Sequence, residues 1–181
     1  MSKKIPEDWG RVKVKGNQEL DLSNILDTAL QKTLKEDFDI LKRRRSERLF
    51  GHRFACNLET TISNLLSTDT KLRVDAPYNK YINGAKQLRK KDGSDQSIEV
   101  DIVLHQRGTN KQNLLVIEIE TTNNPEKDDL WKLEGMTKTS GEYEYEYGLY
   151  LCFGIENKAG KILNEIWYKN GKEADYNLLS Q

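Results

Sequence analysis

The chain has no long apolar run and few cysteines, prolines or histidines. No stretch approaches the roughly 18 apolar residues that a membrane-spanning helix requires, and residues 1–6 lack the apolar centre of a signal peptide. We therefore expect no membrane partner and a cytoplasmic location. Cys56 and Cys152 are the only cysteines, and each has apolar neighbours and no metal-ligand spacing. Buried, reduced thiols are expected at both positions.

The chain also has no excess of either charge. Its 29 Lys and Arg residues balance 29 Asp and Glu residues, so any surface that binds nucleic acid must be local. The zero net charge and the clustering of apolar residues argue for a folded chain. Two histidines and two separate cysteines suggest no catalytic triad and no zinc site. The chain has neither the Gly-x-x-x-x-Gly-Lys phosphate-binding loop nor the Gly-x-Gly-x-x-Gly dinucleotide-binding motif.

The length and the periodicity of apolar residues predict one main domain of the mixed α/β (α+β) class. We expect an N-terminal arm at 1–20, a helical extension at 21–50 and a domain at 51–181, with a helix break near Gly51. The expected sheet is mixed and flanked by helices. Further elements are expected as helices at 52–67 and 126–139, strands at 71–76, 98–105, 113–120, 147–153 and 162–168, and a loop at 83–97.

The most informative segment is 114–120, which reads as a buried strand but carries Glu118 and Glu120. Side chains two residues apart share one face of a strand, so these carboxylates should stand side by side. Burying two like charges is costly unless they share a cation. Asp101 lies in the preceding predicted strand, so two neighbouring strands direct carboxylates toward one place. The pattern predicts a divalent-metal site, and a solvated sheet face is the alternative.

These residues and the order of elements around them resemble the core of the PD-(D/E)xK nucleases, over about residues 50–155. Glu59, Asp101 and Glu118 stand where that family has a helix glutamate, the motif aspartate and the second acid. The resemblance implies a restriction-endonuclease-like fold and hydrolysis of phosphodiester bonds in DNA, with RNA left open. It also implies Mg²⁺ or Mn²⁺ bound by Asp101 and Glu118, with Glu120 as a further ligand or as general base.

The sequence departs from the family motif at two positions. Val100 replaces the motif proline, and Glu120 occupies the position of the lysine that orients or activates the attacking water. Elsewhere in the superfamily the lysine role moves to the following helix, where Lys127 and Lys132 are the candidates. A catalytically inactive module that binds nucleic acid or protein remains the alternative. A protein-interaction domain without any nucleic acid partner is a third possibility.

Several cations are candidates for contacts with nucleic acid. Arg107 ends a predicted strand, and His52 and Arg53 open a predicted helix, where capping and solvation are the alternative. Basic clusters at 42–48 and 86–91 could add phosphate contacts or could simply be solvated. The resemblance further suggests a homodimer.

Overall fold

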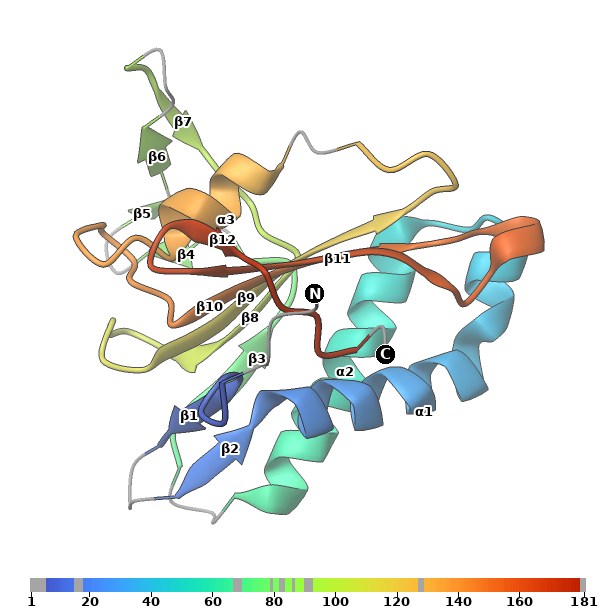
Figure 1. The fold of residues 1–181 in the computed structure, drawn as a ribbon, viewed down its shortest axis with the longest axis horizontal. Coiled ribbons are helices and arrows are strands. Elements are labelled where there is room, and N and C mark those ends of the chain that lie inside the picture. The colour runs from blue at the N-terminus through green and yellow to red at the C-terminus, as the bar shows by residue number, and fades with distance from the viewer. Residues whose placement is uncertain are drawn as a thin grey trace.

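The computed structural model describes residues 6–14, 18–66, 70–78, 80–81, 84–85, 87–89, 93–126 and 129–179 (Figure 1). Its centre is a six-stranded mixed sheet in the order β12-β11-β10-β9-β8-β3. The first three strands of this sheet in chain order, β3, β8 and β9, form an antiparallel meander. Strand β10 then pairs in parallel with β9. The strands are β3 (Leu72–Asp75), β8 (Ile102–Gln106), β9 (Asn113–Thr121), β10 (Tyr147–Phe153), β11 (Ile162–Lys169) and β12 (Lys172–Ala174). The prediction of a mixed sheet flanked by helices is confirmed.

Helices cover both faces of the sheet, as Figure 1 shows. Because side chains alternate along β9, Ile117 packs into the core beneath the long helices while Val116 packs into a second core with Leu133. Strand β9 is therefore buried on both faces, which explains its nearly continuous apolar sequence. The helices are α1 (Leu22–Lys42), α2 (Glu47–Leu65) and α3 (Leu130–Met136), with a short 3₁₀ helix η1 (Glu156–Lys158) after β10.

Short two-stranded sheets accompany the six-stranded sheet. The predicted arm contains the antiparallel pair β1 (Arg11–Lys13) and β2 (Glu19–Asp21), and its apolar side chains are buried in the main core. The region predicted as a loop, 83–97, contains β5 (Gly84–Ala85), which pairs with β4 (Lys80–Tyr81) just before it, and the pair of β6 (Gln87–Arg89) with β7 (Asp95–Ser97). The prediction of a loop at 83–97 is therefore wrong for the residues that these strands cover, whereas the strands of the N-terminal segment are extended backbone.

The first two helices meet at a different place from the predicted one. Helix α1 ends at Lys42, and Arg44 adopts the left-handed backbone conformation with φ of +48°. Helix α2 begins at Glu47, about five residues earlier than predicted. The predicted break at Gly51 is wrong, because Gly51 lies inside α2 and packs against Ile119.

The third helix is shorter than predicted, since it begins only at Leu130. The backbone before it is bound by side chains of the sheet. The Glu126 N–H donates to both carboxylate oxygens of Glu120 at 3.3 and 3.2 Å, and the Glu126 carbonyl accepts from the Tyr150 hydroxyl at 3.1 Å. These contacts bind the Glu126 N–H and carbonyl to side chains, so a helix start there is wrong.

The structure also bears on the expectations about membrane-spanning helices and about the two cysteines. Within the described ranges, no helix is both long enough and apolar enough to cross a membrane. Cys152 is buried as expected, but Cys56 is exposed on α2, where its Sγ lies 3.7 Å from His52 Nε2. The buried thiol predicted at Cys56 is therefore wrong.

Candidate functional site

The candidate site forms where β9 runs past the start of β8. The strand register pairs Ile102 with Ile117, so Asp101 lies opposite Glu118. Beyond this point the pairing of β9 with β8 ends, and side chains bind backbone donors of β9. The Ile119 N–H donates to Asp101 Oδ2 at 2.7 Å. The Thr121 N–H donates to Glu47 Oε2 at 2.8 Å. Two carboxylates thus satisfy strand donors that would otherwise lack a partner.

Glu118 is the buried acid of the site. Its side chain faces α3 and only 4% of the residue is exposed. Lys132, from α3, places its Nζ 3.3 Å from Glu118 Oε1 and 3.2 Å from Asp129 Oδ1. The same ammonium group donates to the Glu99 carbonyl at 3.2 Å. Despite this ion pair, Glu118 Oε1 accepts no well-aligned hydrogen bond from any described residue.

The burial of these groups shifts their pKa values. Loss of hydration raises the pKa of Glu118 well above its usual range, and the neighbouring Asp101 adds to that rise. Loss of hydration also raises the pKa of Asp101, although the Ile119 N–H opposes it. The protonated Glu118 carboxyl can donate to the Asp101 carboxylate, which favours one shared proton over two charges.

Two opposing effects act on the pKa of Lys132. Burial alone would lower the pKa of its ammonium group, but the carboxylates of Glu118 and Asp129 raise it above the ordinary value. Lys132 therefore remains a cation at neutral pH. Lys132 faces the carboxylates of Glu118 and Asp129, and Glu47 also lies within electrostatic range of Asp101.

Glu120 shares a strand face with Glu118 but has separate partners. The Tyr150 hydroxyl donates a short hydrogen bond to Glu120 Oε2, and the Glu126 N–H donates to both oxygens. The structure thus brings Asp101 and Glu118 into contact and engages Glu120 elsewhere. Among the described residues, no group of three or more His, Cys, Asp or Glu side chains is arranged to hold a metal ion.

The predicted helix glutamate, Glu59, lies away from the candidate site around Asp101 and Glu118. Glu59 is on α2, but its Oε2 accepts a hydrogen bond from the Val74 N–H at 2.5 Å, at the outer strand of the sheet. Glu47, in the first turn of the same helix, is the α2 glutamate that reaches β9. Lys132 is the helix lysine that meets Glu118, whereas Lys127 falls outside the described residues.

The three predicted nucleic-acid contacts also differ in their positions. The Arg107 guanidinium donates to Asp75 through Nε at 3.1 and 2.8 Å, at the opposite end of β8 from Asp101. Arg53 points toward α1, where its Nε donates to Asp37 Oδ2 at 2.8 Å. His52 is the one of the three that shares a cavity with Asp101.

That cavity belongs to a groove between α2 and the chain around β3. The part nearest the candidate site is lined by Arg48, Gly51, His52, Ala76, Pro77 and Asp101. The adjoining part is a hollow of about 280 Å³, lined by His52, Ala55, Cys56, Glu59, Val74 and Ala76. Because the two parts share His52 and Ala76, the groove connects the candidate site with the outer strand of the sheet.

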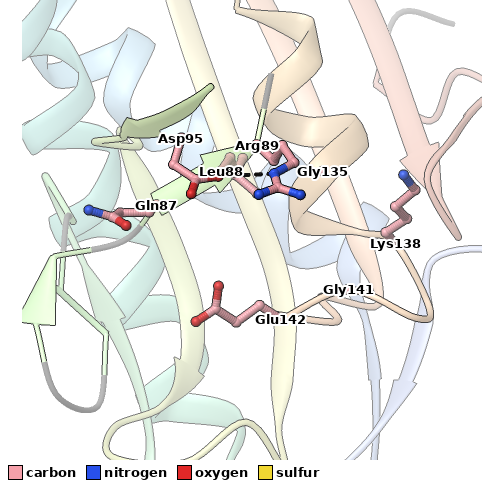
Figure 2. Close-up of a pocket in the computed structure, with 8 residues that line it drawn as sticks. All are labelled: Gln87, Leu88, Arg89, Asp95, Gly135, Lys138, Gly141 and Glu142. Atoms are coloured by element: carbon pink, nitrogen blue, oxygen red, sulfur yellow. Dashed lines mark hydrogen bonds and ion pairs between the residues drawn. The ribbon is translucent and has the colours of Figure 1, made fainter. Parts of the chain in front are cut away.

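A second hollow, of about 300 Å³, lies between the β6–β7 pair and α3 (Figure 2). Arg89 and Asp95 form an ion pair of 3.3 Å across β6 and β7, and Leu88 packs closely against Gly135. Figure 2 shows Lys138 and Glu142 on the other sides of the hollow. None of its described lining residues belongs to the predicted site. The lining residues are Gln87, Leu88, Arg89, Asp95, Gly135, Lys138, Gly141 and Glu142.

Sequence reasoning missed two residues of the candidate site, Glu47 and Tyr150. Glu47 was hidden because the helix that carries it was predicted to begin only at residue 52. Tyr150 was missed because it reaches Glu120 through the parallel pairing of β10 with β9, in which Tyr150 lies beside Glu118. The signal for Tyr150 was its position in an otherwise apolar strand, since a buried hydroxyl requires a partner.

Comparison with known proteins adds no assignment to this geometry. The sequence matches no known protein-family model, and it matches no curated protein.

Proposed function

We propose that the protein is a metal-dependent nuclease that hydrolyses phosphodiester bonds of DNA. The observation that carries this proposal is the buried contact of Asp101 with Glu118, together with Lys132 Nζ 3.3 Å from the Glu118 carboxylate. Lys132 comes from the helix that follows the Glu118 strand. In some PD-(D/E)xK proteins the motif lysine has moved to this helix, which supports the resemblance.

The order of elements also supports a restriction-endonuclease-like core. Helix α2 is followed by the β3–β8–β9 meander, by α3 and by β10 parallel to β9. This is the helix, strand, strand, strand, helix, strand order on which the resemblance rests. Asp101 lies immediately before the second strand of that series, β8, and Glu118 lies on the third, β9.

The pair of acids fits a divalent cation that takes two ligands from the protein. Mg²⁺ prefers oxygen donors and often uses only one or two carboxylates, with water and substrate phosphate as the other ligands. Asp101 and Glu118 provide such donors, and the buried Oε1 of Glu118 lacks an aligned hydrogen bond. Bound Mg²⁺ or Mn²⁺ would polarise the phosphodiester and lower the pKa of a coordinated water.

The residues of the chain itself would hold and orient the reacting groups. Lys132 stays protonated, so it acts as a hydrogen-bond donor and a positive charge beside the phosphate, and not as a general base. Asp129 limits the positions of the Lys132 ammonium group. Tyr150 and the Glu126 N–H hold the Glu120 carboxylate, whose partners are separate from those of Glu118.

An inactive module that binds nucleic acid is the second candidate, and one observation favours it. Lys132 already compensates the charge of Glu118, so the buried acids have a cation without any metal. The proposed nuclease and the inactive module then differ in whether a divalent cation can enter beside Lys132.

The test combines metal binding with cleavage. Calorimetry with Mg²⁺ and Mn²⁺ would be run on the wild type and on Asp101→Asn, Glu118→Gln and Lys132→Met, while plasmid and single-stranded DNA are assayed for cleavage. Glu142→Gln, an exposed acid at the second hollow, is the matched control. We expect metal-dependent cleavage that the control retains and the other three variants lose. Metal binding without cleavage of any substrate would support the inactive module, and absence of metal binding would reject the site.

A further inference from the structure

The turn between α1 and α2 gathers positive charge on one exposed surface. Every residue from 42 to 49 is exposed. Five of these eight residues are cations, although the whole chain has no net charge. We call this group the basic corner, defined as Lys42, Arg43, Arg44, Arg45 and Arg48.

The basic corner adjoins the candidate site directly. Glu47, in the middle of it, accepts the hydrogen bond from Thr121 at the end of β9. Arg48 lines the same cavity as Asp101, and its Nη2 lies 3.0 Å from Glu99 Oε1. Figure 1 shows the start of α2 beside the end of β9. A chain that reaches Asp101 from this side therefore passes these cations first.

The cations of the corner are available for a new partner. Arg43 pairs with Asp39, but both side chains are more than 60% exposed. Arg48 is also paired at the surface, with 78% of its side chain exposed. Exposed pairs of this kind contribute little free energy, so they exchange readily. Arg44 and Arg45 form no ion pair with any described residue.

The chemistry of the corner fits phosphate groups. The guanidinium group is planar, is always charged and can bind two phosphate oxygens at once. The acids around Asp101 repel a polyanion, so phosphates need cations nearby before they can approach that site. We propose that the basic corner binds the phosphate backbone of DNA and directs it to the groove beside Asp101. The choice of DNA rests on the proposed function.

The test compares two variants that lose the same charge. Arg44→Gln with Arg45→Gln removes two cations from the corner. Lys138→Gln with Lys172→Gln removes two exposed cations near the β11–β12 turn, at the opposite end of the parallel strands β9 and β10. Binding to fluorescent duplex DNA would be measured by anisotropy in EDTA, from about 50 to about 200 mM salt. EDTA removes any contribution of a divalent cation.

The expected result is specific to the corner. Each lost phosphate contact reduces the slope of log affinity against log salt by about 0.9, so the corner variant should lose about 1.8 and bind at least roughly tenfold more weakly. The control variant should bind like the wild type, and Arg44→Lys with Arg45→Lys should retain most of the affinity. Circular dichroism and thermal unfolding would confirm that all variants fold. Equal weakening in both glutamine variants, or no DNA binding by the wild type, would overturn the proposal.

Cleavage assays on the same proteins separate this proposal from the nuclease proposal. If the wild type cuts DNA and the corner variant binds and cuts equally well, the basic corner is rejected and the nuclease stands. If the corner variant loses binding but the wild type never cuts with Mg²⁺ or Mn²⁺, the basic corner stands and the nuclease is rejected.

Discussion

At the scale of single residues, Lys132 is the cation on which the candidate site depends. Its replacement by Met would leave Glu118 buried beside Asp101 without a positive charge. We expect Lys132→Met to lower the free energy of unfolding by about 2 to 3 kcal/mol, because breaking a buried pair leaves one charge unpaired. Urea denaturation at neutral pH measures this loss.

A double variant provides the control for Lys132. In Glu118→Gln with Lys132→Met, the buried negative charge is absent, so most of the lost stability should return. If the double variant is as unstable as the sum of both single variants, the two side chains do not interact and the assignment of Lys132 to Glu118 fails.

Tyr150 has a comparable role for Glu120. Its single hydroxyl hydrogen is shared between Glu120 and the Glu126 carbonyl, so Tyr150→Phe removes the donor that serves both acceptors. We expect a loss of about 1 to 3 kcal/mol in thermal or chemical unfolding. Tyr176→Phe is the matched control, since the Tyr176 hydroxyl makes no hydrogen bond among those described. Equal effects of the two changes would contradict the role of Tyr150.

Residue spacing predicted part of the site and could not predict the rest. Two rules were sufficient for Asp101 and Glu118: alternation along a strand, and the facing positions of a hairpin. The separation of Glu120 from them depends on Tyr150, which comes from a strand 30 residues later. Such a partner is fixed by the pairing of distant strands, which local sequence patterns do not encode.

At the scale of elements, the glycines Gly51 and Gly148 give opposite predictions. An added Cβ at Gly51 in α2 would lie 3.7 Å from Ile119 Cδ1, which is an ordinary contact. At Gly148 in β10, a Cβ would meet Thr137, Tyr168 and Leu133 at 3.1 to 3.3 Å. Gly51→Ala should therefore stabilise the protein by about 0.5 to 1 kcal/mol through better helix propensity.

Gly148→Ala should instead destabilise the protein by about 1 to 3 kcal/mol, because the packed neighbours must move apart. Calorimetric melting of both variants checks the pair of predictions. A lower melting temperature for Gly51→Ala would show that α2 and β9 have no space for the methyl group. An unchanged melting temperature for Gly148→Ala would show that the neighbouring side chains near α3 and β11 move apart at little energetic cost.

Element boundaries follow tertiary contacts more than local preference. Gly51 suggested a helix break from composition alone, but it lies inside α2, where the helix packs against Ile119 of β9. The sequence suggested a helix start at Glu126, yet side chains from the sheet bind the backbone of that residue. The strands at 147–153 and 162–168 were predicted well because their apolar runs are long and are bounded by turn residues.

At the scale of the whole molecule, the raised pKa values of the buried acids couple stability to pH. The ordinary pKa of Glu118 is 4.5, and the folded value lies well above it. The stabilisation from its protonation is therefore complete below about pH 4.5 and is lost as pH rises through the folded pKa. Asp75 has a lowered pKa, so its contribution changes only in more acidic solution.

We expect the free energy of unfolding, measured without divalent metal, to decline from about pH 5 toward neutral pH. Glu118→Gln should flatten this profile, since its amide does not titrate. Mg²⁺ or Mn²⁺ should raise the melting temperature more at about pH 8 than at about pH 5.5, because protons compete for the same oxygens. An identical profile in Glu118→Gln would assign the pH dependence to other groups.

The carboxylates that cap strand donors also limit how this protein can meet another protein. Glu59 occupies the Val74 N–H on the outer strand, while Asp101 and Glu47 occupy the donors where β9 overhangs. An extended peptide normally joins a sheet by binding such open donors. At these positions the donors are already bound, so strand addition would first have to displace an acidic side chain. A partner, including a second copy in a dimer, would recognise these positions through side chains and not through the backbone.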